Sequence, residues 1–353
     1  MTRKRKIGLT VGLTIFIGLA FLIWFGFKGI MKEVVLSDTY PENNPYKRVS
    51  ISPDDEQIAF SYFKNRKGAI YLADKKGNVK ELAKPKKSYH YIDPMFFADG
   101  QKLLFLSSSY EKELKQAIYI MNVDGTRIKR LTPEDELVTE AVISPKGNRI
   151  YYIKAAEFYA EHPGVAAIPY NYDLYSIDIN GSNIHRITKF SSDFIHDLSI
   201  SADGTKLGMI LEPFDKNDNP IKANILNSTK ETEYVVYDIK TNEFTALSVP
   251  LSGGIYETFP VISPNGKKVA FNNDRTPEDE NYDVELSEFD ISTGKISPLS
   301  KLETESMVYA NDNTLYFIYD TDRDFDKRNL RLGKINSDGS GFSEVINFNE
   351  MMK

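Results

Sequence analysis

Apolar and polar positions follow one pattern that recurs along the chain. An apolar residue, a Ser, and a Pro or Ala precede a tight turn of Asp, Asn or Gly, and an apolar strand follows. We number the matching segments repeats 1 to 6: SISPDDEQIAF (50–60), MFFADGQKLLF (95–105), VISPKGNRIYY (142–152), SISADGTKLGM (199–209), VISPNGKKVAF (261–271) and VYANDNTLYFI (308–318). Each repeat predicts two antiparallel strands joined by a tight turn.

The spacing of the turns indicates a repeat architecture. The turn residues are separated by 45, 47, 57, 62 and 46 residues: Asp55, Gly100, Gly147, Gly204, Gly266 and Asp312. The fourth residue before each turn is apolar in every repeat: Ile51, Phe96, Ile143, Ile200, Ile262 and Val308. The first strand of every repeat is therefore expected to bury the same position.

Each repeat carries a second pair of strands, seen best in AIYIMNVDGTRIKRLT (117–132) and DLYSIDINGSNIHRIT (173–188). The Asp-Gly and Asn-Gly pairs tolerate positive φ, as tight hairpin turns require. Each repeat thus predicts four antiparallel strands, which we name A to D in chain order. A sheet of four strands cannot cover both its apolar faces alone. We therefore predict an all-β fold, a six-bladed β-propeller of four-stranded antiparallel blades over residues 47–353. An open solenoid is the alternative, but it needs polar capping repeats that the sequence does not show.

The Ser-Pro-Asp-Gly type of turn and the IYIMNVDG segment resemble the TolB-like, or WD40-like (PD40), β-propeller repeat family. The resemblance covers about residues 47–347 by repeat period. It implies the fold and leaves the function open. The family's namesake is a soluble periplasmic protein with an additional N-terminal α/β domain, in place of which this chain has an apolar segment. We therefore expect a membrane-anchored member without that domain, and the resemblance does not extend to envelope translocation.

That apolar segment runs from Ile7 to Phe27 without a charge, a span of roughly 30 Å as a helix. It predicts one N-terminal transmembrane signal-anchor helix over residues 7–27. Basic residues before it predict a short cytoplasmic tail over 1–6 and an extracytoplasmic propeller, joined by a linker over 28–46. The expected location is the cell membrane, single-pass. A cleaved signal peptide is the alternative, but the segment is long and lacks a small-residue cleavage site.

The composition of the chain excludes several kinds of site and partner. The chain has no cysteine, so disulfides, thiolate zinc sites and cysteine nucleophiles are excluded. Residues 1–28 hold five basic residues and no acid, which leaves 39 basic against 50 acidic residues in the rest. Phosphate backbones are bound by clustered Lys and Arg. Nucleic acid is therefore not an expected partner.

Loop lengths give the propeller two different ends. The A-to-B and C-to-D turns share one end, and the B-to-C and D-to-A loops share the other. The long insertions are all B-to-C loops: 155–172, 212–233, 272–283 and 320–329. Binding residues are common in loops on a rigid scaffold. We expect partners to bind at the end with the insertions.

A ring of acids is predicted at that end. The seventh residue before each turn is a carboxylate in four repeats, Asp93, Glu140, Asp197 and Glu305, with Arg48 and Phe259 in the other two. Converging carboxylates at a channel mouth could hold a cation or bind a basic peptide. The alternative is that each one only caps a loop.

The insertion of repeat 3 is rich in aromatic residues. It carries Phe158, Tyr159, His162, Tyr170 and Tyr172, which suit the recognition of a peptide or a sugar. The alternative is a loop that folds back over the channel.

No catalytic or metal-binding motif is recognisable. The sequence has neither HExxH nor G-x-S-x-G, and the acidic run from Asp320 departs from a calcium loop because Phe325 and Arg331 replace its Gly and Glu. We predict no catalytic residue, no metal ligand and no cofactor, apart from a cation in the channel. His90 and His196 with nearby acids are the remaining candidates for a catalytic site.

These features predict a membrane-tethered, extracytoplasmic binding or scaffold module. Its loop face would recognise a protein, a peptide or a component of the cell envelope such as a cell-wall glycan. The alternatives are a propeller enzyme, a glycan lyase or hydrolase with its site at the channel mouth, and a purely structural partner of a membrane complex.

Overall fold

The computed structural model describes residues 43–85, 89–109, 115–159, 168–192, 194–212, 225–226, 233–249, 259–275, 283–322 and 328–352. The chain divides into two compact units. The first, 1–41 with 159–168, lies almost wholly outside the described residues. The second, 42–158 with 169–353, contains the sheets considered below.

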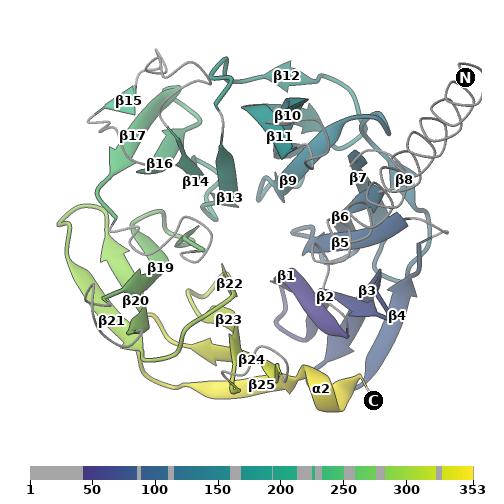
Figure 1. Cartoon of the computed structure of the whole chain (residues 1–353), viewed down its shortest axis with the longest axis vertical. Coiled ribbons are helices and arrows are strands. Elements are labelled where there is room, and N and C mark those ends of the chain that lie inside the picture. Colours follow the sequence, from purple (N-terminus) through teal and green to yellow (C-terminus); the bar gives the residue numbers. More distant parts are fainter. Residues whose placement is uncertain are drawn as a thin grey trace, which may run out of the picture. The chain divides into compact units, whose positions relative to one another are not determined.

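The second unit is built almost entirely from antiparallel strands (Figure 1). The first sheet contains β1 (Asn44–Ile51), β2 (Gln57–Lys64), β3 (Lys67–Asp74) and β4 (Val79–Ala83). An eight-stranded sheet follows, with β5 (Tyr89–Phe96), β6 (Lys102–Ser109), β7 (Lys115–Asn122), β8 (Lys129–Arg130), β9 (Leu137–Ile143), β10 (Arg149–Tyr159), β11 (Ile168–Asp178) and β12 (His185–Arg186).

Three further sheets complete the unit. One contains β13 (Ile195–Ile200), β14 (Lys206–Leu211), β15 (Ile225–Leu226), β16 (Glu233–Asp238) and β17 (Glu243–Leu247). The next contains β18 (Val261–Ile262), β19 (Lys268–Asp274), β20 (Val284–Asp290) and β21 (Ile296–Ser300). The last contains β22 (Ser306–Tyr309), β23 (Leu315–Asp320), β24 (Leu330–Ile335) and β25 (Ser343–Asn347), with helix α2 (Phe348–Met351) after it.

The all-β propeller architecture is confirmed, but the prediction of six separate four-stranded blades is wrong. Four sheets are single blades of four or five strands, whereas repeats 2 and 3 share the eight-stranded sheet. The cause is a parallel pairing of β7 with β9 between Gln116 and Leu137, supported by a 3.0 Å hydrogen bond from Gln116 N to Glu136 O.

The predicted transmembrane helix is also not found. No helix in the described part of the chain is long and apolar enough to cross a membrane. The helix that is described, α2, has four residues and so rises only about 6 Å. Residues 7–27 themselves lie outside the described ranges.

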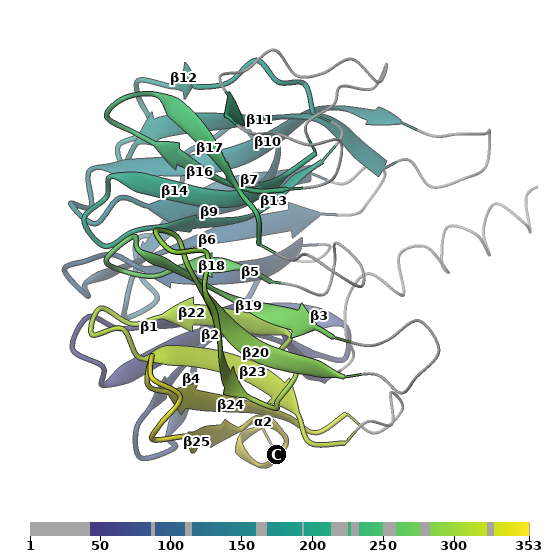
Figure 2. The same cartoon turned by 90° about the vertical axis from the view of Figure 1, so that its left-hand side faces the viewer.

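The sheets are arranged in a ring around a common centre (Figure 1). The innermost strands are β1, β5, β9, β13, β18 and β22, and each contacts the next, with β22 returning to β1. The short turns lie on one side of the unit, and the long strands β10 and β11 extend on the other (Figure 2). Part of the insertion expected as a loop in repeat 3 is therefore strand.

The Ser of the repeat holds the tight turn after the innermost strand. Ser52 Oγ accepts a 2.8 Å hydrogen bond from Gln57 N and donates to Asp54. Ser201 Oγ bonds in the same way, with Lys206 N as donor at 3.0 Å. The Ser hydroxyl therefore satisfies a backbone N–H of the following strand, which explains why it recurs in the sequence.

The ring closes where the last sheet meets the first, and we call this contact the seam. Among the described residues no strand is shared across it: β1–β4 form one sheet and β22–β25 another. Buried apolar side chains hold it instead, including Phe60, Ile318 and Leu332. Phe348 of α2 is fully buried there, with its ring edge-on to Phe60 at 5.3 Å.

We expect Phe348→Ala to lower the free energy of unfolding by about 3–5 kcal/mol, because it removes a fully buried ring from the seam. Urea denaturation measures the loss. Phe342→Ala, directly before β25, is the matched control, since that residue is 47% exposed and removing its ring should cost about 1 kcal/mol or less. Equal losses in the two variants would contradict the importance of α2 to the seam.

Candidate functional site

One cavity of about 860 Å³ occupies the centre of the ring and is lined mainly by the innermost strands. All six residues at the seventh position before a turn line it: Arg48, Asp93, Glu140, Asp197, Phe259 and Glu305. The sequence-predicted acids are thus brought together. Arg48 against four carboxylates leaves the lining with a formal charge of −3 when His196 is neutral.

Interruptions in strand pairing position these side chains. The register of β5 with β6 shifts between Ile92 and Met95, around Asp93, and that of β13 with β14 shifts between His196 and Ser199, around Asp197. Asp93 and Asp197 have φ of 53° and 56°, a left-handed conformation that Asp tolerates better than most residues. Such bulges redirect side chains from the plane of the sheet. They explain why charged residues can stand in the middle of buried strands.

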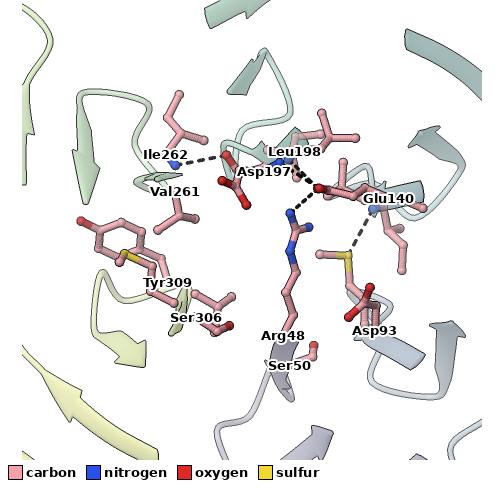
Figure 3. A pocket seen from close by; sticks show the side chains of 18 of the residues that line it. Arg48, Ser50, Asp93, Glu140, Asp197, Leu198, Val261, Ile262, Ser306 and Tyr309 are labelled. Atoms are coloured by element: carbon pink, nitrogen blue, oxygen red, sulfur yellow. Dashed lines mark hydrogen bonds and ion pairs between the residues drawn. The ribbon is translucent and has the colours of Figure 1, made fainter. Parts of the chain in front are cut away.

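Glu140 is the centre of the charged group (Figure 3). Its Oε2 lies 2.5 Å from Arg48 Nη2, across the channel from β1. Its two oxygens also accept hydrogen bonds from the backbone of β13, at 2.9 Å from Asp197 N and 2.7 Å from Leu198 N. Glu140 therefore links three innermost strands while it belongs to the acidic ring.

Arg48 lies among several carboxylates. Burial opposes the charged form, but Glu140, Asp93 and Asp197 together raise the pKa of the Arg48 guanidinium above its ordinary value. Its side chain is 27% exposed. The charged group therefore already contains one cation held by an excess of acids.

His196 and Asp197 form a second contact at the same level. His196 Nδ1 lies 2.9 Å from Asp197 Oδ2. One ligand atom from each of Glu140, His196 and Asp197 lies within 4.8 Å of the others, a spacing that could suit a metal ion. Arg48 already brings a positive charge to Glu140, which disfavours a metal there.

Glu305 differs from the other acids. It pairs with Arg328, which also contacts Asp320 at 3.2 Å. Its charge is therefore largely compensated by a residue outside the lining. The other acids of the lining, Asp93 and Asp197, lie with the Arg48–Glu140 pair.

Deeper in the channel the lining changes character. Every charged residue of the lining stands at the level described above, and the remainder is apolar or carries neutral polar groups. Tyr309 donates a 2.6 Å hydrogen bond to Glu288, whose other oxygen pairs with Lys268. Burial and Glu288 raise the pKa of Tyr309 well above its ordinary value, so its phenol stays neutral. The cavity thus combines an acidic mouth with an apolar interior.

A family model for the TolB β-propeller domain (PD40) matches residues 29–223, more than half of the chain. The chain belongs to this family. No curated protein matches it.

Solved structures agree with the fold of this TolB-family propeller. TolB from Acinetobacter baumannii is 17% identical, with a TM-score of 0.57 over 83% of this chain, which spans 64% of the TolB chain. An oligogalacturonate lyase in complex with manganese is 13% identical, with a TM-score of 0.53 over 80% of this chain and 75% of its own. A putative TolB from Agrobacterium tumefaciens is 15% identical, with a TM-score of 0.52 over 77% of this chain and 85% of its own. At these identities the likeness shows the fold alone.

The aromatic residues predicted in the insertion of this TolB-family chain do not form one described cluster. Tyr172 is buried and lines the cavity. Tyr170 bonds to Glu157. His162 lies outside the described residues, as do the side chains of Phe158 and Tyr159. Their role in binding stays a prediction.

Arg48 and His196 line the cavity but were missing from the predicted binding set. Arg48 occupies the same repeat position as the acids, so its place in the lining could have been predicted from the sequence. His196 directly precedes Asp197, but nothing in the sequence indicates the register shift that brings both into the lining.

His90 does not join His196. It is absent from the lining, its ring lies 5.2 Å from that of Phe63, and its Nδ1 accepts a 3.1 Å hydrogen bond from Gly68 N. A catalytic site combining both histidines is therefore not formed. Burial, with a contribution from Lys67, lowers the pKa of His90 to about 4.

We expect Glu140→Gln to destabilise the TolB-family propeller by about 3 kcal/mol, because it breaks a largely buried ion pair and disturbs two backbone hydrogen bonds. Urea denaturation measures the change. Glu134→Gln is the control, since its exposed pair with Arg130 should contribute about 0.5 kcal/mol. A loss no larger than that of the control would refute the linking role of Glu140.

His90 should make stability depend on pH. Its folded pKa of about 4 lies below its ordinary value of 6.5, so between these values the unfolded chain binds more protons. The His90 contribution is complete above pH 6.5 and is lost progressively as the pH falls towards 4. The melting temperatures of wild type and His90→Asn should differ most above pH 6.5 and approach each other as the pH falls from 6.5 towards 4. Parallel pH profiles would show that His90 titrates normally.

Proposed function

We propose that this TolB-family propeller is a binding module that holds a positively charged group of a protein or peptide partner at the mouth of its central channel. The observation that carries the proposal is the acidic group of Asp93, Glu140 and Asp197, gathered from three innermost strands, β5, β9 and β13, into one cavity. Even without Glu305, which pairs with Arg328, the formal charge of these three carboxylates exceeds the positive charge of Arg48.

Electrostatics favour a cationic ligand at this place. A concave site lined by one sign of charge concentrates field lines and attracts the opposite charge. Arg48, which is part of the chain, already shows that a guanidinium is stabilised there. A lysine or arginine side chain of a partner has the same chemistry and can reach the same acids.

The shape supports a short segment of a partner. A volume of about 860 Å³ is within the range of sites that enclose a small ligand or a few side chains. The mouth supplies charge, and the apolar lining below it supplies area for burial.

A divalent-cation-dependent lyase is the second candidate. The spacing of Glu140, His196 and Asp197 favours it, as does the manganese named with the oligogalacturonate lyase structure. The Arg48 contact and the backbone bonds to Glu140 weigh against it, because they already occupy the carboxylate. Calorimetric titration with manganese tests this candidate directly.

We expect Asp93→Asn and Asp197→Asn each to weaken the binding of basic peptides by about tenfold, because each removes a negative charge from the mouth. Asn is nearly isosteric and tolerates the same positive φ. Peptides would first be selected from a random library on the full chain and then titrated by calorimetry at low and high salt. Affinity should fall as salt rises.

Asp124→Asn and Asp338→Asn are the matched controls, since both acids are in exposed turns outside the cavity lining. Neither should change the affinity. The proposal fails if the selected peptides are not enriched in Lys and Arg, or if the two channel variants bind them as wild type does.

A further inference from the structure

We propose that Arg48 determines the specificity of the channel mouth by acting as an internal occupant of the cation position, which a ligand must displace. This inference rests on the proposed cation-binding function and adds how the access of ligands to that site is regulated. Arg48 then selects for ligands that gain binding energy elsewhere in the cavity.

The position of Arg48 indicates that its guanidinium occupies the cation position and does not merely line the cavity. It extends from β1 across the channel towards Glu140 on β9, 92 residues away in the sequence (Figure 3). The pairing of β1 with β2 shifts register between Pro45 and Val49, next to Arg48. A long, flexible side chain that starts from such an interruption can adopt other positions without moving the sheet.

Glu140 does not depend on Arg48 for its position. Its oxygens accept hydrogen bonds from Asp197 N and Leu198 N, both on β13. When Arg48 moves away, these two donors still hold the carboxylate in place. Displacement therefore exchanges one cation for another and leaves the contact between β9 and β13 intact.

The partial exposure of Arg48 makes the exchange accessible. Its side chain is 27% exposed, whereas that of Glu140 is 11% exposed. The guanidinium contacts Glu140 through Nη2 and Oε2. Such a contact is weaker than a bidentate pair, in which two parallel bonds form.

A tethered cation competes with every free one. Because Arg48 is part of the chain, its effective concentration at the acids is high. The apparent affinity for a ligand falls by the fraction of time for which the site is free of Arg48. A small cation without further contacts therefore binds poorly.

A ligand overcomes this competition by also filling the apolar interior. Further along the innermost strands the lining includes apolar residues that are partly exposed: Met95, Ala141, Ile200, Val261 and Val308. Burying an apolar group there supplies free energy that a lone cation lacks. The favoured ligand is thus a basic side chain next to an apolar one on the same segment.

Chemical rescue tests this directly. The probe is butylguanidinium, which reproduces the end of the Arg48 side chain, and butylurea is its neutral counterpart. We expect Arg48→Ala to bind butylguanidinium about tenfold more tightly than wild type in calorimetry. A matching rise in melting temperature should accompany binding, and butylurea should produce neither effect.

Arg127→Ala is the matched control, because Arg127 is exposed in the turn after β7 and its loss changes the net charge equally. It should bind butylguanidinium as wild type does. If Arg48→Ala does not fold, Arg48→Gln retains part of the stem and a donor for Glu140, and it takes the place of the alanine variant in the same titrations. Equal binding of butylguanidinium to wild type and the Arg48 variant overturns the inference.

The selected basic peptides separate this inference from the function on which it rests. Tighter binding to Arg48→Ala than to wild type supports displacement. Binding to wild type that weakens in Arg48→Ala overturns displacement and leaves the function standing, because Arg48 would then hold the ligand. Absence of charge-dependent binding in both proteins overturns the function itself.

Discussion

Each innermost strand lies at the inner edge of its repeat, and the backbone N–H groups that stay unpaired along that edge need acceptors. β9 pairs there with β7 only at Leu137. Side chains from the preceding repeat supply several of them. Ser50 Oγ accepts from Phe96 N at 3.0 Å, and Ser199 Oγ accepts from Ile262 N at 3.2 Å. Met95 Sδ lies 3.3 Å from Ile143 N. These hydrogen bonds join neighbouring innermost strands where no strand pairing exists, and the shape of the channel depends on them.

The need of backbone N–H groups for acceptors also accounts for the charged residues at the mouth of the channel. At the bulges, the N–H of Asp93 bonds to Ser61 Oγ at 2.9 Å, and the N–H of Asp197 bonds to Glu140. The backbone of each bulge is thus satisfied by the preceding repeat, so its carboxylate is not needed for that purpose. Glu140 is the exception, since it serves both the backbone of β13 and the acidic ring. Stability and ligand binding are therefore coupled at Glu140 and separable at Asp93 and Asp197.

Much of this arrangement was predictable from repeat position alone. The acids at the seventh position before each turn share a cavity. The burial expected at the fourth position holds for Phe96, Ile143 and Ile262, whereas Ile51, Ile200 and Val308 are partly exposed. The bulges were not predictable, because they depend on the register between two strands. The contact of Arg48 with Glu140 joins residues 92 apart, and no local pattern encodes it. The predicted number of separate sheets was wrong because one backbone pairing, Gln116 with Leu137, joins two repeats into one sheet. No pattern of apolar and polar residues signals such a single pairing.

The seam has a consequence for the order in which the molecule assembles. Each sheet is made from a continuous stretch of chain, so its strands can pair soon after they leave the ribosome. The contact of Phe348 with Phe60 joins residues from the two ends of the described chain and cannot form until the last of them has been made. Until then, the apolar faces of the first and last sheets remain exposed to other chains. This interval is when the protein is most open to misassembly and to capture by chaperones.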